Sequence, residues 1–298
     1  MKVFYSDDYT AAKYDFDTTR KARAIAEDLR GHALAGLELA VPRSVTSGEL
    51  CQVHDKAYVD AVRTGHPRSM AGSQGFEWDE GVWRMACATT GGVVDAALTA
   101  LNDGISGTLS SGIHHARYDR GSGFCTFNGL ALACAEARKR VNRVLIIDLD
   151  AHCGGGTSSL IHDMPGVYQF DISTCQFDAY DDSEHGELHI VQGAIEYLSI
   201  LQRGLARLEE RDGFGLALYN AGMDPYNNGP EGDAITEDVL RERDAMVFQW
   251  CRNREIPLAF TLAGGYTGYR LGLADVVRLH RITIEAAVRS TIDGRRSR

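Results

Sequence analysis

Four segments of the sequence bring together residue types that can bind a metal ion or move a proton. They are His114–His115, Asp148–His152, Asp224 and Tyr266, and each follows a short run rich in β-branched or aliphatic residues. Imidazole titrates near neutral pH, carboxylates bind cations, and a phenol can donate a hydrogen bond to a developing oxyanion. We therefore take these segments as the candidate active site.

Asp150, His152 and Asp224 form a candidate metal site. Asp150 and His152 are two residues apart, so an extended backbone directs both side chains to the same side. Three protein ligands with an open position are typical of catalytic zinc, whereas structural zinc is usually closed by four ligands. The same donors would accept Fe(II), Co(II) or Mn(II). Each residue alone could be a helix cap or a solvated carboxylate, but the three at separate strand ends favour a metal.

The adjacent histidines and the tyrosine are candidates for proton transfer and carbonyl polarisation. A lone histidine is usually structural, whereas His114 and His115 facing a metal are expected to act as general base and acid. Asp148 could fix the tautomer of a histidine, or instead bind a structural cation or cap a helix. Gly264 and Gly265 permit a tight turn that would project Tyr266 inward, although ordinary packing would also explain the phenol.

The elements that must position these residues alternate between strand and helix along the whole chain. This alternation predicts one α/β domain over residues 1–298, with a mainly parallel sheet, helices on both faces and a short basic C-terminal tail. In such sheets a ligand binds beyond the carboxyl ends of the strands, where the four segments lie. The expected strands are Val3–Tyr5, Gly107–Ser110, Arg143–Leu149, Val167–Ile172, Gly215–Asn220 and Pro257–Leu262. The expected helices are Thr18–Leu29, Ser47–Arg63, Glu80–Leu101, Phe127–Arg140, Gly193–Leu208, Glu237–Arg254 and Leu271–Val288.

Composition excludes several classes of protein. The 298 residues are 44% hydrophobic with a formal charge of −10, which fits a folded domain and argues against binding nucleic acid through its phosphates. The sequence shows no secretory signal or apolar span, and its seven scattered cysteines lack a CxxC pair, so we expect a cytoplasmic protein with reduced thiols. The run Gly154–Gly156 lacks the lysine and spacing of a phosphate-binding loop.

Five motifs, in this order along the chain, resemble those of the histone deacetylase superfamily, which includes bacterial deacetylases and acetylpolyamine amidohydrolases. They are HHA at His114–Ala116, SGFC at Ser122–Cys125, IDLDAH at Ile147–His152, GMDP at Gly222–Pro225 and LAGGY at Leu262–Tyr266. The resemblance spans nearly the whole chain and is closest to class IV and bacterial members. It implies a three-layer arginase/deacetylase fold and zinc-dependent hydrolysis of an N-acyl amide, such as acetyl-lysine, an acetylpolyamine or a small acylated metabolite.

The resemblance also implies roles for individual residues. Asp150, His152 and Asp224 correspond to the zinc ligands, and His114, His115, Tyr266 and Asp148 to the catalytic residues, with His115 as the general base and acid. Phe124 and Gly123 correspond to the tunnel that holds the acylated amine. Asp148, Asp150, His152 and Asp171 resemble a structural site for K⁺ or Na⁺.

The sequence departs from the family pattern directly after the ligand histidine. Most members have His-Gly-Asn or His-Gly-Asp there, whereas this chain has Cys153, Gly154 and Gly155. Gly155 cannot orient His115 as an Asn or Asp side chain would, and a loss of this kind typically costs about 10- to 100-fold. Three explanations are open. Another group replaces the missing Asn or Asp side chain, or the enzyme is slow, or the properties of the site have changed. We interpret Cys153 as packing beside the ligand.

Two other functions remain as alternatives. A binuclear manganese ureohydrolase shares the fold but needs DxHxD, and Gly154 occupies the last position of that motif. A non-catalytic acyl-amine binding protein would explain the residue at Gly155, but not the intact histidine pair and Tyr266. The expected partner is an acylated amine, with neither nucleic acid nor membrane, and the oligomeric state stays open.

Overall fold

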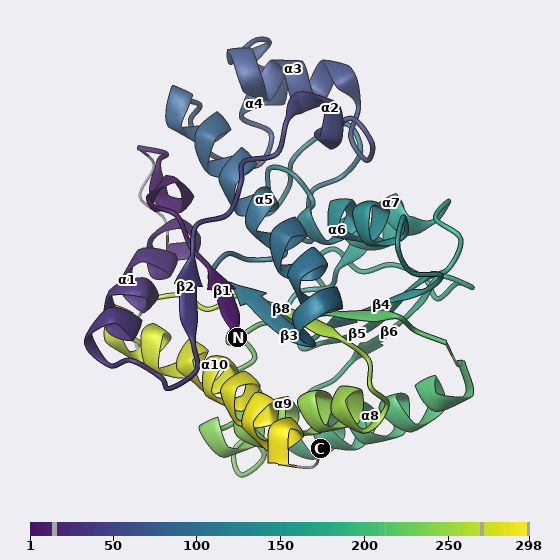
Figure 1. Ribbon diagram of the computed structural model, residues 1–298. Coiled ribbons are helices and arrows are strands. Elements are labelled where there is room, and N and C mark those ends of the chain that lie inside the picture. The colour runs from purple at the N-terminus through teal and green to yellow at the C-terminus, as the bar shows by residue number, and fades with distance from the viewer. Residues whose placement is uncertain (14–16, 212, 269–270, 297–298) are drawn as a thin grey trace.

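The computed structural model describes residues 1–13, 17–211, 213–268 and 271–296, which form one eight-stranded parallel sheet flanked by helices (Figure 1). The strand order is β2-β1-β3-β8-β7-β4-β5-β6, and all neighbours are parallel. The strands are β1 Lys2–Phe4, β2 Glu38–Ala40, β3 Ile105–Thr108, β4 Val144–Asp148, β5 Val167–Ser173, β6 Gly186–Ile190, β7 Leu216–Ala221 and β8 Leu258–Leu262. The α/β class with a parallel sheet is confirmed.

Helices cover both faces of the sheet, as the run of apolar residues in β4 predicts (Figure 1). On one side lie α1 Asp17–Gly31, α8 Ala194–Leu208, α9 Glu237–Asn253 and α10 Leu273–Arg296. On the other lie α2 Ser47–Leu50, α3 Lys56–Thr64, α4 Arg68–Ala71, α5 Glu80–Asp103, α6 Gly129–Ala137 and α7 Gly155–Ile161. Leu145 and Ile147 join the core under the first group, whereas Val144 and Ile146 join the core under the second. Alternate side chains of one strand therefore fill two separate cores.

The six expected strands are all present, but the prediction missed the two edge strands. β2 and β6 stand at opposite ends of the sheet and are only partly buried. β6 carries Glu187 and His189, so it lacks the apolar run that marks a strand covered on both faces. Edge position explains both the polar composition and the failure to detect these strands.

The expected helix Ser47–Arg63 is wrong, because the chain forms two helices with a break between them. The Asp55 carboxylate accepts hydrogen bonds from the Ala57 and Tyr58 backbone N–H groups and so begins α3. The capping box of Thr46 and Glu49 is present at the start of α2, as its spacing predicts. An internal N-cap therefore outweighs the continuous helical pattern.

Four other helices differ from the expectation. α6 is shorter than Phe127–Arg140, because the Asn128 side chain accepts from the Ala131 N–H and sets its start. α7 and α4 were not predicted, and α7 begins within the glycine run. α10 continues through Arg296, so residues 294–296 of the basic tail are helical.

Two expectations about the chain as a whole can be compared with the structure. All seven cysteines are free and five of them are buried. Among the described residues, no helix combines the length and the apolar character needed to cross a membrane.

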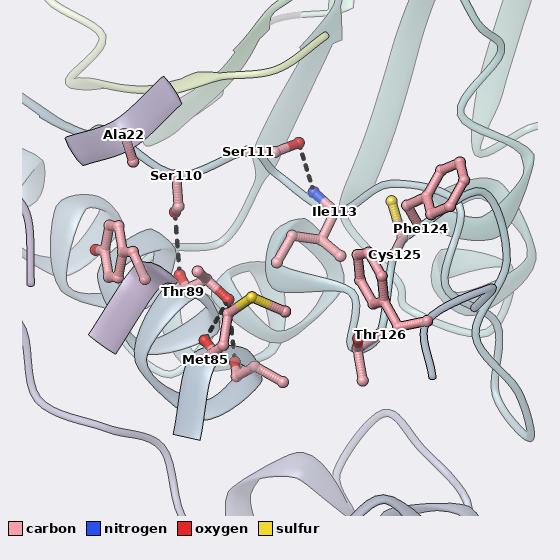
Figure 2. Close-up of a pocket in the computed structure, with 12 residues that line it drawn as sticks. Ala22, Met85, Thr89, Ser110, Ser111, Ile113, Phe124, Cys125 and Thr126 are labelled. Carbon is pink, nitrogen blue, oxygen red and sulfur yellow. Dashed lines mark hydrogen bonds between the residues drawn. The ribbon is translucent and has the colours of Figure 1, made fainter. Parts of the chain in front are cut away.

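A small apolar cavity lies between α5 and the chain that follows β3 (Figure 2). Its lining includes Met85 and Thr89 of α5, with Ile113, Phe124 and Thr126 from the opposite segment. Ile113 and Phe124 both have positive φ angles, 60° and 61°, which L-residues adopt only when their surroundings hold them there. The segment between β3 and α6 is thus bent tightly beside the carboxyl edge of the sheet.

Candidate active site

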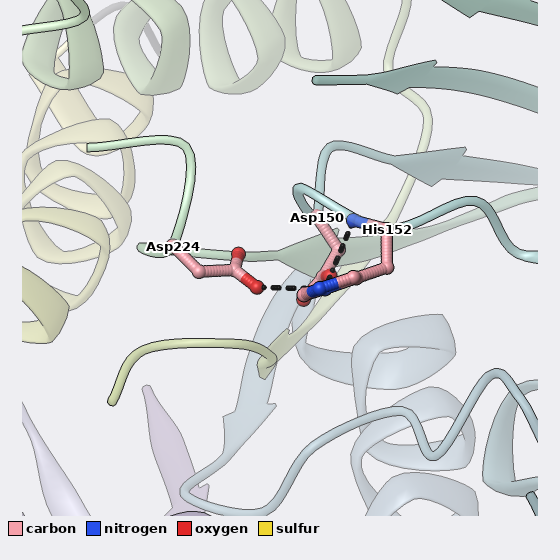
Figure 3. A group of neighbouring side chains, drawn as sticks. All are labelled: Asp150, His152 and Asp224. Carbon is pink, nitrogen blue, oxygen red and sulfur yellow. Dashed lines mark hydrogen bonds and ion pairs between the residues drawn. The ribbon is translucent and has the colours of Figure 1, made fainter. Parts of the chain in front are cut away.

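The candidate residues converge on one edge of the sheet. β3, β8, β7 and β4 are consecutive neighbours, and the four segments singled out in the sequence follow their carboxyl ends. Asp150 and His152 follow β4 and Asp224 follows β7, so the strand order brings them together (Figure 3). One potential ligand atom from each lies within 4.8 Å of the others.

The oxygen and nitrogen atoms that these three residues offer fit a divalent cation. Asp150 Oδ2 accepts from the Gly264 N–H at 2.6 Å, and Asp224 Oδ1 accepts from the Ala151 N–H at 3.0 Å. Asp224 Oδ2 is buried and lies 3.1 Å from His152 Nδ1, but no hydrogen bond of normal geometry reaches it from the described residues. A buried carboxylate oxygen without a hydrogen bond is unfavourable unless a cation binds it.

The electrostatics of the three residues also favour positive charge at this point. The carboxylates of Asp150 and then of Asp224 raise the pKa of His152 to about 11. Burial, together with the charge of Asp150, raises the pKa of Asp224 above its ordinary value. Two carboxylates meeting at one imidazole thus favour either a proton on His152 or a metal ion between them, and a ligating histidine would be neutral.

His114 is paired with Asp148 at the end of β4. His114 Nδ1 lies 2.8 Å from Asp148 Oδ2, and Asp148 Oδ1 accepts from Asn220 Nδ2 at 2.8 Å. Burial opposes protonation of His114, but the charges of Asp148 and Asp150 outweigh it and raise the pKa to about 10. A cation bound to Asp150 would offset part of this charge. The expected contact between Asp148 and a histidine is therefore present.

His115 is paired with Asp178, which the sequence did not identify. His115 Nδ1 lies 2.9 Å from Asp178 Oδ2, and since a carboxylate can only accept, Nδ1 carries the proton. Burial, followed by the charge of His114, lowers the pKa of His115 to about 4 against the opposing effect of Asp178. The neutral ring is therefore left with an unprotonated Nε2, which can accept a proton.

The Gly-Gly turn packs directly on Asp224, one of the candidate metal ligands. A Cβ at Gly264 would lie 2.1 Å from Asp224 Oδ2, and one at Gly265 would lie 2.7 Å from His280 Nε2. Gly265 also has a φ of +148°, so a side chain at Gly265 is excluded for two independent reasons. The turn needs its glycines, as predicted, and half-buried Tyr266 follows it.

The two expected tunnel residues have different surroundings. A Cβ at Gly123 would lie 2.5 Å from His115 Cδ2 and 3.2 Å from Phe177 Cε1, so Gly123 passes closely beside the histidine. The ring of Phe124 packs against Phe76 with centroids 5.5 Å apart and lines the apolar cavity of Figure 2. Phe177 was missed, although its ring is perpendicular to that of His115 at 5.0 Å and 47% of the residue is exposed.

Asp171 lies on β5 beside Asp148 of β4, at the same level of the sheet. Its carboxylate accepts from the Gly154 N–H, the Gln169 side chain and the Ser173 hydroxyl. Burial, followed by the charge of Asp148, raises the pKa of Asp171 well above its ordinary value. Cys153, next to the candidate ligand His152, is buried and its thiol donates to the Cys175 carbonyl at 3.2 Å, in keeping with the packing role expected for it.

The glycine run has a packing function. A Cβ at Gly156 would lie 2.4–2.5 Å from backbone atoms of His114 and His115, and the Thr157 N–H donates to the His114 carbonyl at 2.8 Å. The start of α7 therefore rests on the backbone of the histidine pair. Close approach of these two segments, and not phosphate binding, accounts for Gly156.

Comparisons with known proteins agree with this arrangement. The model for the histone deacetylase domain matches residues 16–278. An uncharacterized protein of Picosynechococcus sp. is 31% identical over 243 residues, covering 79% of this chain and 80% of the relative. The histone deacetylase 2 of Arabidopsis thaliana is 27% identical, covering 89% of this chain and 74% of that protein. A probable deacetylase of Methanothermobacter thermautotrophicus is also 27% identical, covering 93% of this chain and 88% of that protein.

The fold is shared with a solved structure of low sequence identity. A crystal structure of acetylpolyamine aminohydrolase from Burkholderia pseudomallei superimposes with a TM-score of 0.75 at 16% identity, covering 96% of this chain and 98% of that one. This likeness confirms the expected arginase/deacetylase fold. With the domain match over most of the chain, it follows that the protein belongs to the histone deacetylase family and is a hydrolytic deacetylase.

Proposed function

We propose that the protein is a zinc-dependent amidohydrolase that removes an acyl group, most simply acetyl, from an acylated amine. The observation that carries the proposal is the meeting of the three potential metal ligands with two His–Asp pairs at one sheet edge. The ring of His115 is perpendicular to that of His152, with centroids 5.9 Å apart, so a proton carrier stands beside the ligand group.

Asp150, His152 and Asp224 would hold the metal ion. When bound, it would supply Lewis-acid polarisation of the amide carbonyl and lower the pKa of a water molecule. The proposal favours zinc because one imidazole and two carboxylates leave coordination open for substrate. The neighbouring carboxylates of Asp148 and Asp171 support a second, structural site, for which the family resemblance implies K⁺ or Na⁺.

The side chains of the protein would carry the proton and hold the developing charge. Nε2 of His115 takes a proton from the attacking water and later delivers it to the leaving amine. His114, hydrogen-bonded to Asp148, would stabilise negative charge that develops nearby. The hydroxyl of Tyr266 donates to the oxyanion that forms from the substrate carbonyl.

The acylated amine would reach the site past Gly123, Phe124 and Phe177. The exposed ring of Phe177 beside His115 offers an apolar surface for a narrow aliphatic stem, which acetyl-lysine and acetylpolyamines share. The names of the relatives support both kinds of substrate, since they include histone deacetylase and acetylpolyamine aminohydrolase.

A turnover assay with matched variants tests this proposal. Zinc-loaded protein is expected to hydrolyse a fluorogenic acetyl-lysine peptide or N-acetylputrescine, and a hydroxamate is expected to inhibit it. Tyr266→Phe and His115→Ala should lower kcat by about 100-fold or more while metal content is unchanged. Binding of the acylated amine without turnover by the wild type would support a binding protein instead. Two manganese ions per chain with release of urea would support the ureohydrolase.

A further inference from the structure

We propose that Asp178 is the positioning residue for His115, supplied by the loop between β5 and β6 in place of the side chain that Gly155 lacks. The inference rests on the proposed function, in which His115 exchanges the proton. It identifies which of the three explanations for the departure at Gly155 applies: another group has replaced the missing one.

The contacts of Asp178 are those of a residue that fixes an imidazole. Oδ2 lies 2.9 Å from His115 Nδ1 and also accepts from the Gly156 N–H at 2.9 Å. Oδ1 is paired with the guanidinium of Arg117. The Asp178 side chain is 5% exposed, so these partners and not water hold the carboxylate. The ring of His115 is therefore fixed in both tautomer and orientation.

Gly155 and Asp178 are mutually dependent. A Cβ at Gly155 would lie 2.1 Å from the Asp178 carbonyl oxygen and 2.8 Å from Asp178 Oδ1. An Asn or Asp side chain at Gly155 would therefore occupy the space that Asp178 now fills. Only a glycine at this position lets the loop approach, so the loss of one partner and the gain of the other are two parts of one change.

The loop is held on both sides of Gly155. The Cys153 N–H donates to the Phe177 carbonyl at 3.0 Å, and the Gly156 N–H donates to Asp178. Asp178 has a φ of 64°, a region that Asp adopts more readily than most residues. These contacts outweigh the cost of that backbone conformation and place the carboxylate beneath His115.

The test uses variants of Asp178 and two independent measurements. In metal-free protein labelled with ¹⁵N-histidine, wild-type His115 should show a protonated Nδ1 and an unprotonated Nε2. Asp178→Ala should abolish that pattern. Asp178→Asn, whose carbonyl oxygen can still accept from Nδ1, should keep it. With zinc and the fluorogenic peptide, kcat should fall about 100-fold in Asp178→Ala and about 10-fold in Asp178→Asn, with KM nearly unchanged.

Two further variants complete the test: one is a control, and the other displaces the loop without changing Asp178. Asp181→Asn removes an exposed carboxylate from the same loop and should leave both the nitrogen signals and kcat unchanged. Gly155→Ala adds no polar group, yet it should disturb the His115 pattern as Asp178→Ala does, because its Cβ displaces the loop. Circular dichroism checks that each variant is folded.

The outcomes separate this inference from the proposed function. An unchanged His115 nitrogen pattern in folded Asp178→Ala would overturn the inference, whatever the activity. If wild-type protein hydrolyses no acylated amine while the pattern depends on Asp178, the proposed function fails and the positioning contact stands. Equal kcat values for wild type and Asp178→Ala would overturn the role of Asp178 in the reaction.

Discussion

The two adjacent histidines are each paired with a carboxylate, but the pairs are built in different ways. Asp148 belongs to the last position of β4, is fully buried, and is fixed by the Asn220 amide from the neighbouring strand. Asp178 comes from a loop and is fixed by Arg117, whose side chain is 27% exposed. One pair is thus built into the sheet, and the other is assembled from two loops.

The two histidines also differ in their pKa values. The pKa of His114 is raised to about 10, whereas that of His115 is lowered to about 4. Two residues next to each other in sequence are therefore expected to carry opposite protonation states at pH 7. Neighbouring titratable groups with separated pKa values are a common arrangement in acid–base catalysis, with one group acting as a charge and the other as a base.

The largest expected effect concerns which histidine carries the proton. His115→Ala removes the neutral base and should lower kcat by about 1,000-fold, whereas His114→Ala removes a nearby charge and should lower it by about 100-fold or less. Both rates are measured with zinc-loaded protein, and bound zinc is determined for each variant. A larger loss in His114→Ala than in His115→Ala would reverse the assignment.

For stability, we expect the larger loss at the His114–Asp148 pair, the reverse of the order expected for kcat. Asp148→Asn breaks a fully buried pair and should lower the free energy of unfolding by about 3 kcal/mol, since buried His114 would lose the nearer of its two counter-charges. Asp178→Asn acts at a loop and should cost about 1 kcal/mol. Urea unfolding of the metal-free protein at pH 7 measures both. Equal losses would show that the loop pair is as much a part of the folded core as the sheet pair.

The same contrast explains what could be predicted from the sequence. Asp148, Asp150 and His152 lie at alternating positions after an apolar strand, so their convergence with Asp224 follows from strand alternation and the parallel sheet. Asp178 contacts a histidine 63 residues away, and no local pattern distinguishes it from Asp181 or Asp182 on the same polar loop. Residues placed by strands are predictable in a way that residues placed by loops are not.

The sequence nevertheless contained one indication of the missing partner. Gly155 departs from the family pattern. This departure indicated that another group could orient His115, but it did not identify that group. Identifying Asp178 required the distance between the start of α7 and the loop, because only that distance shows that a side chain at Gly155 would collide with the loop. The edge strands β2 and β6 were missed for a related reason, since their pairing is made by neighbours and not by a buried apolar run.

A pH effect is expected at His54, which is hydrogen-bonded to the backbone of the segment that carries both histidines. His54 Nδ1 donates to the Arg117 carbonyl at 2.8 Å, and Nε2 accepts from the Asn128 N–H at 2.9 Å. The Asn128 side chain in turn donates to the His114 carbonyl at 3.2 Å. Both bonds of His54 require the neutral ring, and burial lowers its pKa from 6.5 to about 4.

Acid should therefore loosen the two pairs together through His54. Between pH 6.5 and 4 the unfolded chain binds a proton at His54 that the folded protein excludes, so stability falls as the pH is lowered, by about 3 kcal/mol in total at most. His54→Asn should show a shallower decline of the unfolding free energy over this interval, in metal-free protein at fixed ionic strength. Parallel curves for the two proteins would mean that His54 does not set the acid limit. In that case a group other than His54 takes up the proton. The His114–Asp148 pair and the His115–Asp178 pair would then lose stability independently of each other.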